Sequence, residues 1–110
     1  MTKAKVYMYD KFAGILSEDD DGFHFKYEPQ YLESENAESI SLTMPIRTET
    51  FSSKILFPFF DGLIPEGWLL DIAAKNWKLD VRDRMSILLV TCADCIGAVS
   101  IKELKESENE

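Results

Sequence analysis

The sequence lacks the patterns that hold the phosphates of a bound nucleotide. None of its five glycines forms G-x-G-x-x-G or G-x-x-x-x-G-K-[ST], the loops in which backbone amides surround phosphate groups. Phosphoryl transfer also requires a charge-neutralising lysine and side chains that bind Mg²⁺, and the sequence shows no such set. We therefore predict that the chain is not an enzyme and that it holds no cofactor.

Cysteine and histidine, which supply thiol chemistry and most ligands of structural zinc, are also scarce. The two cysteines, Cys92 and Cys95, are spaced as C-x-x-C, and His24 is the only histidine. A structural zinc ion takes four ligands, and no second cysteine pair is present. The pair falls near the C-terminus of an expected helix, where the helix dipole disfavours a thiolate. We predict buried, reduced cysteines and no metal site; a metal or thiol-redox protein using Cys92 and Cys95 is the less favoured alternative.

Long apolar runs are absent as well. The densest apolar stretch, residues 55–79, is interrupted by prolines and charged residues. A membrane-spanning helix needs roughly 20 apolar residues without such breaks. The N-terminus runs directly into a strand-like segment and shows no apolar signal region. We predict a cytoplasmic protein that makes no membrane contact.

Basic residues are few relative to acidic ones. The chain has 12 lysines and arginines against 20 acidic residues, which gives a net charge of −8, and the basic residues form no run along the sequence. Because this field repels a polyanion such as DNA, we expect no direct contact with nucleic acid. A protein partner with a basic surface fits the charge better. Acidity that only keeps a small protein soluble is the alternative.

What the sequence does contain is enough apolar material for a packed core, since 45% of the residues are hydrophobic. Alternating or Val- and Tyr-rich segments predict five strands. These lie at residues 5–9, 12–17, 23–27, 40–44 and 98–101. An Asp-Gly pair at residues 21–22 predicts a tight turn before the third of them.

Helical signals dominate the second half. We predict a short helical turn at residues 54–60, a helix over 65–78 that starts at Pro65, and another from Val81 with Asp80 as its cap. Strands followed by helices predict an α+β fold. It would be a small, largely antiparallel sheet of about five strands, with two to three helices from the second half packed on it. We expect one domain over residues 1–102 and a charged, flexible tail over 103–110.

Four segments resemble the N-terminal subdomain of HipA-type serine/threonine kinases, which are toxins of bacterial toxin–antitoxin systems. They are the opening hairpin at residues 6–16, ISLTMPI at 40–46, PFFDGLIPEG at 58–67 and DCIGAV at 94–99. The last three are similar to that family's SLSLP, FFxxLLPEG and DCxGAV motifs. The order and spacing of the PEG and DCxGAV motifs are the most specific part of the resemblance.

The chain departs from a full-length kinase of this type in two ways. It ends nine residues after Ile101, and it reads Trp68-Leu69-Leu70-Asp71 where the family often has an arginine. These features are similar to the small stand-alone, HipS-like subunit of three-component systems. The resemblance implies an antitoxin that binds and inhibits a HipA-like kinase lacking its own N-terminal subdomain, in a complex with a helix-turn-helix DNA-binding protein. The alternative is a complementing subunit that stabilises the active form of a split kinase.

The expected contact surface is centred on Trp68. On a helix with about 100° per residue, Trp68 lies on the side opposite Trp77 and points away from the apolar face. An exposed tryptophan is typical of an interface hot spot. A Trp68 covered by a neighbouring loop is the alternative. The predicted interface residues are Trp68, Pro65, Glu66, Gly67, Asp61 and Asp71.

Overall fold

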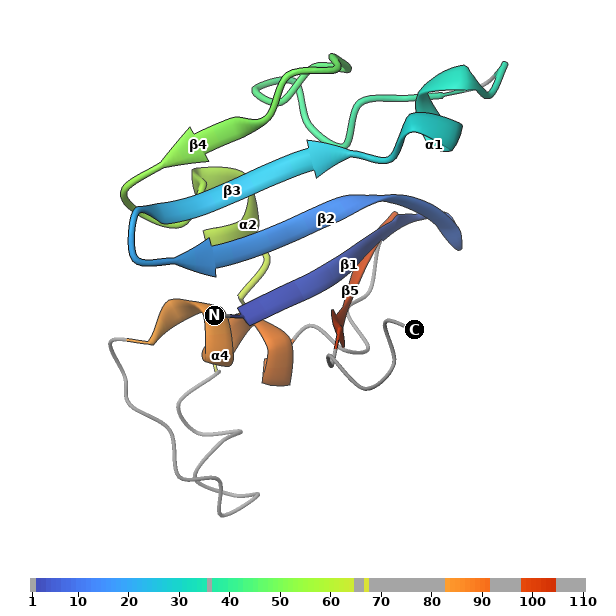
Figure 1. Ribbon diagram of the computed structural model, residues 1–110. Helices are drawn as coiled ribbons and strands as arrows, with labels where there is room; N and C mark the ends of the chain where they lie inside the picture. Colours follow the sequence, from blue (N-terminus) through green and yellow to red (C-terminus); the bar gives the residue numbers. More distant parts are fainter. Residues whose placement is uncertain (1, 36, 65–66, 68–82, 92–97, 105–110) are drawn as a thin grey trace.

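The computed structural model describes residues 2–35, 37–64, 67, 83–91 and 98–104 (Figure 1). Five strands form one antiparallel sheet in the order β4-β3-β2-β1-β5. Their bounds are β1 Thr2–Met8, β2 Lys11–Asp19, β3 Gly22–Tyr27, β4 Phe51–Ser53 and β5 Val99–Leu104. The helices in the described residues are α1 Pro29–Glu33, α2 Pro58–Asp61 and α4 Arg84–Thr91. The expected α+β class with a five-stranded antiparallel sheet is therefore confirmed.

Two tight hairpins build the first three strands. Tyr9 and Asp10 turn the chain between β1 and β2 with φ values of 50° and 70°, the left-handed region that suits a two-residue hairpin. The second turn ends at Gly22, whose φ is 125°. The Asp19 carboxylate accepts the amide N–H of Asp21 at 2.8 Å and closes that turn. The Asp-Gly signal in the sequence is thus confirmed.

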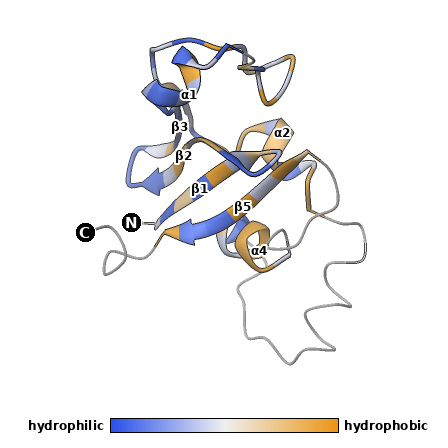
Figure 2. Cartoon of the chain, turned by 90° about the vertical axis from the view of Figure 1, so that its right-hand side faces the viewer, coloured by the Kyte–Doolittle hydropathy of each residue, from blue (hydrophilic) through white to orange (hydrophobic). Residues whose placement is uncertain are grey.

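The core lies on one face of the sheet. Side chains alternate along each strand, so residues such as Val6, Leu16 and Phe25 point to the same side and are completely buried. The ring of Phe60 from α2 packs 5.7 Å from that of Phe25, and α4 contacts β5 on this side (Figure 2). Removing these apolar surfaces from water is the main force that holds the helices on the sheet.

The prediction of a strand at residues 40–44 is wrong. Ser41 and Met44 pair only with each other, at the ends of a tight turn, and the fourth strand of the sheet is the later segment β4. The Ser41 hydroxyl accepts the amide of Thr43 at 3.2 Å, a local bond that competes with strand pairing. Leu42, at the tip of the turn, is 98% exposed. The alternation of apolar residues therefore does not mark a half-buried strand here.

Helix boundaries also differ from the expected ones. The turn expected from residue 54 begins at Pro58, and Pro29 starts α1, which the sequence did not predict. Helix α4 begins at Arg84, and the carboxylate of Asp83 caps it by accepting the Ser86 amide at 3.1 Å. Val81 and Asp80, the predicted start and cap of this helix, lie outside the described residues. The helix predicted over residues 65–78 lies outside the described residues. No helix among those described is long and apolar enough to cross a membrane.

Candidate docking surface

The PFFDGLIPEG segment is anchored to the core through α2. Pro58 occupies the first turn of this helix, where its missing N–H costs nothing. Phe60 is completely buried, and its ring meets that of Phe57 edge to face at 6.2 Å. The chain therefore leaves α2 from a fixed position towards Gly67, which is exposed. Helix α2 itself, held in this way, would lose little conformational freedom if it bound a partner.

Asp61, the last residue of α2, forms an ion pair with the first residue of α4. The Nε and Nη2 atoms of Arg84 lie 2.8 Å and 2.6 Å from Oδ1 of Asp61. The side chains are 45% exposed for Asp61 and 36% for Arg84, so water screens the pair. The pair ties α2 to α4 on the surface. Asp61, predicted as a charge at the rim of an interface, thus already has a partner within the chain.

The other predicted interface residues are only partly described. Gly67 is exposed, and a Cβ built on it would meet no atom within 4 Å. Pro65, Glu66, Trp68 and Asp71 lie outside the described residues. Their role in an interface therefore stays a prediction, and Asp61 and Gly67 mark the described edge of that surface.

The sequence did not predict a second feature, a turn at residues 40–46 that is held to the core by hydrogen bonds with Tyr27. The Tyr27 hydroxyl accepts the Ile40 amide at 3.0 Å and donates to the carbonyl oxygen of Met44. Burial raises the pKa of this phenol, while its bond with Ile40 acts in the opposite direction. The turn is thereby held at both ends, and it presents Leu42 to solvent. Nothing in the local sequence indicates a contact with a tyrosine so far away along the chain.

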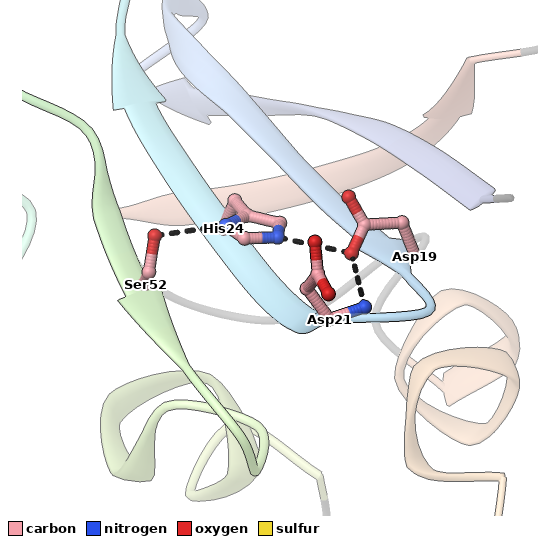
Figure 3. A network of polar contacts seen from close by, with 4 residues as sticks. All are labelled: Asp19, Asp21, His24 and Ser52. Carbon is pink, nitrogen blue, oxygen red and sulfur yellow. Dashed lines mark hydrogen bonds and ion pairs between the residues drawn. The ribbon is translucent and has the colours of Figure 1, made fainter.

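His24 links three neighbouring strands (Figure 3). Its Nδ1 lies 2.8 Å from the Ser52 hydroxyl of β4, and its Nε2 lies 3.1 Å from the Asp19 carboxylate of β2. Bonds from the Asp21 amide and from His24 lower the pKa of Asp19. In serine hydrolases the carboxylate meets Nδ1 and the serine meets Nε2, the reverse of this order. The contacts of His24 therefore hold the short edge strand β4 beside β3.

The described residues offer no metal centre. No group of three or more histidine, cysteine, aspartate or glutamate side chains is arranged among them to hold an ion. Cys92 and Cys95 lie outside the described residues, so the prediction that they are buried and reduced stays open.

The sequence and the fold are both similar to those of the HipA N-terminal domain. Residues 4–102 match the sequence model of the HipA N-terminal domain. A solved structure titled as the N-terminal domain of HipA toxin superposes with a TM-score of 0.74 at 33% identity, covering 96% of this chain and 95% of that one.

Two relatives carry the same module in different settings. An uncharacterized protein of Haemophilus influenzae is 41% identical over 102 residues, which make up 93% of this chain and 92% of that protein. A protein of Sinorhizobium fredii named putative kinase Y4mE is 36% identical over 97 residues, 87% of this chain but only 23% of its own length.

Proposed function

The chain belongs to the HipA N-terminal domain family, and from that premise we propose that it is a non-catalytic protein-binding module. It docks on a HipA-like serine/threonine kinase that lacks its own copy of this domain, and it inhibits that kinase as an antitoxin. The complex is cytoplasmic and includes a helix-turn-helix DNA-binding protein.

One observation carries the proposal. The same module makes up 92% of the Haemophilus influenzae relative and 23% of the putative kinase from Sinorhizobium fredii. A module that occurs both detached and fused is suited to bind, as a separate chain, where its fused counterpart sits. The net charge of −8 favours a basic surface on that kinase, because complementary charge speeds encounter and excludes wrong partners.

The proposed contact surface follows α2 and the residues after it. At its described edge Asp61 is partly exposed and Gly67 is exposed, and Phe60 holds α2 in the core. Trp68 would supply the central anchor, since a tryptophan buries a large area with few rotatable bonds. The predicted surface comprises Asp61, Pro65, Glu66, Gly67, Trp68 and Asp71.

A titration of the purified chain into the HipA-like kinase of its host tests the proposal. We expect substrate phosphorylation to fall towards the level without enzyme at saturation. We expect the Trp68→Ala variant to need at least about a thirtyfold higher concentration, because loss of a hot-spot side chain costs about 2 kcal/mol or more. Unchanged phosphorylation would exclude the inhibitory role, and unchanged binding by Trp68→Ala would exclude Trp68 as the anchor.

A complementing subunit of a split kinase is the second candidate. It is favoured by the fused arrangement in the putative kinase, where the module is part of the same chain. Docking would then stabilise the active kinase, and the same titration would raise phosphorylation. The metal or thiol-redox alternative predicts bound metal or reactive Cys92 and Cys95 thiols, which elemental analysis and thiol titration with and without reductant detect.

A further inference from the structure

The face of the sheet opposite α2 and α4 gathers basic residues that are scattered along the sequence. On β1 the outward positions are Lys3, Lys5 and Tyr7, since Ala4, Val6 and Met8 are buried on the other side. The strand register then places further residues beside them on this outward face. Lys102 on β5 lies directly opposite Lys5, Ile15 on β2 flanks Lys5 on its other side, and Lys26 on β3 lies opposite Ile15.

We call the surface formed by Lys3, Lys5, Lys26, Lys102, Tyr7 and Phe12 the lysine face. Lys102, Lys5 and Lys26 form one row across four strands, which at about 4.8 Å per strand spans roughly 14 Å. Lys3, Lys26 and Lys102 are exposed, and Lys5 is partly exposed. The neighbouring acidic residues Glu18 and Glu103 occupy inward register positions, opposite Phe23 and Ala4. Asp19, the next outward residue of β2 after Ser17, lies at the end of this face, and its carboxylate is already paired with His24. The sequence alone did not reveal this cluster, because strand spacing separates its members.

The arrangement works against stability of the isolated sheet. Lys5 and Lys102 are direct cross-strand partners, and like charges in that position destabilise a sheet. Their ammonium groups diverge onto two rings: Lys5 Nζ lies 5.7 Å from the centre of the Phe12 ring, and Lys102 Nζ lies 5.7 Å from that of Tyr7. The two rings contact each other with centroids 5.9 Å apart. Among the described residues, none of the four lysines forms an ion pair.

From this unneutralised cluster we propose that the lysine face is a second docking surface, which binds a short acidic segment of a partner protein. Its charge is opposite to that of the chain as a whole, so it selects a partner of opposite sign to the one that the proposed kinase-docking surface requires. Lysines lie over the two rings that a nucleobase would stack on, and the overall charge of −8 repels a long polyanion. A short segment with a few carboxylates needs no free ring to stack on, and it is repelled less than a long polyanion.

Fluorescence anisotropy on the full chain tests this proposal, with labelled hexaglutamate as the probe and hexaglutamine as the neutral reference. We expect binding of hexaglutamate only, weakening as salt is added. The double variant Lys5→Gln/Lys102→Gln should weaken binding at least about threefold. The control Lys11→Gln/Lys54→Gln makes the same change in net charge, from −8 to −10, at exposed sites away from this face, and should weaken binding less.

Several results would overturn the proposal. They are no binding of hexaglutamate, equal losses in the two double variants, or tighter binding of oligothymidylate or of phosphatidylserine vesicles through the same lysines. Thermal unfolding checks that the variants are folded; we expect no loss of stability in Lys5→Gln/Lys102→Gln, because a like-charge pair is removed. The single substitution Lys26→Gln, at an exposed position on β3, tests the same face without changing Lys5 or Lys102, and it should also weaken hexaglutamate binding. No kinase is present in these experiments, so their outcome is independent of the proposed function.

Discussion

The hydroxyl of Tyr27, inside the core, accepts the amide N–H of Ile40 at 3.0 Å, thirteen residues further along the chain. The same oxygen donates to the carbonyl of Met44, so one phenol satisfies both ends of an exposed turn. Backbone groups buried without partners are costly, and here a side chain replaces the sheet bonds that the segment does not make. The turn at residues 40–46 is therefore bonded to the core through Tyr27 and is not a strand.

Replacing Tyr27 by phenylalanine removes this support. The Ile40 amide and the Met44 carbonyl would then lose a partner in a buried place, so we expect Tyr27→Phe to lower the free energy of unfolding by about 1–3 kcal/mol. Urea denaturation measures the change. Tyr9→Phe is the matched control, because Tyr9 is 67% exposed at a hairpin tip, and it should leave stability unchanged. Equal effects of the two variants would contradict the role assigned to the Tyr27 hydroxyl.

The ion pair between Asp61 and Arg84 predicts a small coupling between α2 and α4. Both side chains are more than one third exposed, so the pair should contribute no more than about 1 kcal/mol, and less at high salt. A double-mutant cycle with Asp61→Asn and Arg84→Gln isolates this contribution. A coupling energy of zero at low salt would show that the contact does not join the helices in solution.

Glycine is required at position 22. Its φ of 125° is rarely adopted by residues with a side chain, and a Cβ there would collide with the carbonyl oxygen of Ser53. We expect Gly22→Ala to destabilise the protein by at least about 1 kcal/mol, as measured by chemical denaturation. Gly67→Ala, where a Cβ would meet nothing within 4 Å, should have little effect on stability. A neutral Gly22→Ala would contradict the turn geometry.

Asp19 predicts a dependence of stability on pH. Hydrogen bonds from the Asp21 amide and from His24 hold its pKa below the ordinary value of 3.8. A carboxyl group whose pKa is lowered by folding stabilises the folded state above its unfolded pKa, and that stabilisation disappears as the pH falls through the lower folded pKa. Asp19→Asn should therefore lower the urea midpoint at neutral pH but not at a pH below the folded pKa.

The control for this experiment is Asp20→Asn, an exposed position in the same turn. We expect its urea midpoint to follow that of the unmodified chain at every pH. A difference between Asp19→Asn and the unmodified chain that persists unchanged into acid would mean that the carboxylate charge is not what stabilises the turn.

The sequence predicted those elements whose signals are local. Alternation of Phe23, Phe25 and Tyr27 and the Asp-Gly turn marked β3 correctly, because each depends on neighbouring residues. Prediction from the sequence was wrong where contacts between residues far apart in the chain determine the local structure. Alternation in residues 40–44 gave a strand, whereas Tyr27 stabilises a turn there. The three-residue strand β4 is too short to show any period, and its pairing with β3 defines it.

For the candidate surfaces, too, the sequence revealed local motifs but not contacts between distant residues. The PFFDGLIPEG motif could be recognised from the sequence alone, and the structure shows that Phe60 within it is buried. The pairing of Asp61 with Arg84 joins residues 23 positions apart, and the charge pattern along the chain gave no sign of it. The lysine face depends on register, since Lys5 and Lys102 become neighbours only when β1 and β5 pair.

As proposed, this chain would occupy on a HipA-like kinase the place that a fused copy of the same domain takes in a kinase carrying it in its own chain. Isothermal titration against two kinases tests it directly: the host's HipA-like kinase without the domain, and a kinase that carries the domain in its own chain. We predict binding at one to one with the first and no binding with the second, where the place is already filled. Equal binding to both kinases, or binding to neither, would show that the chain does not occupy that place.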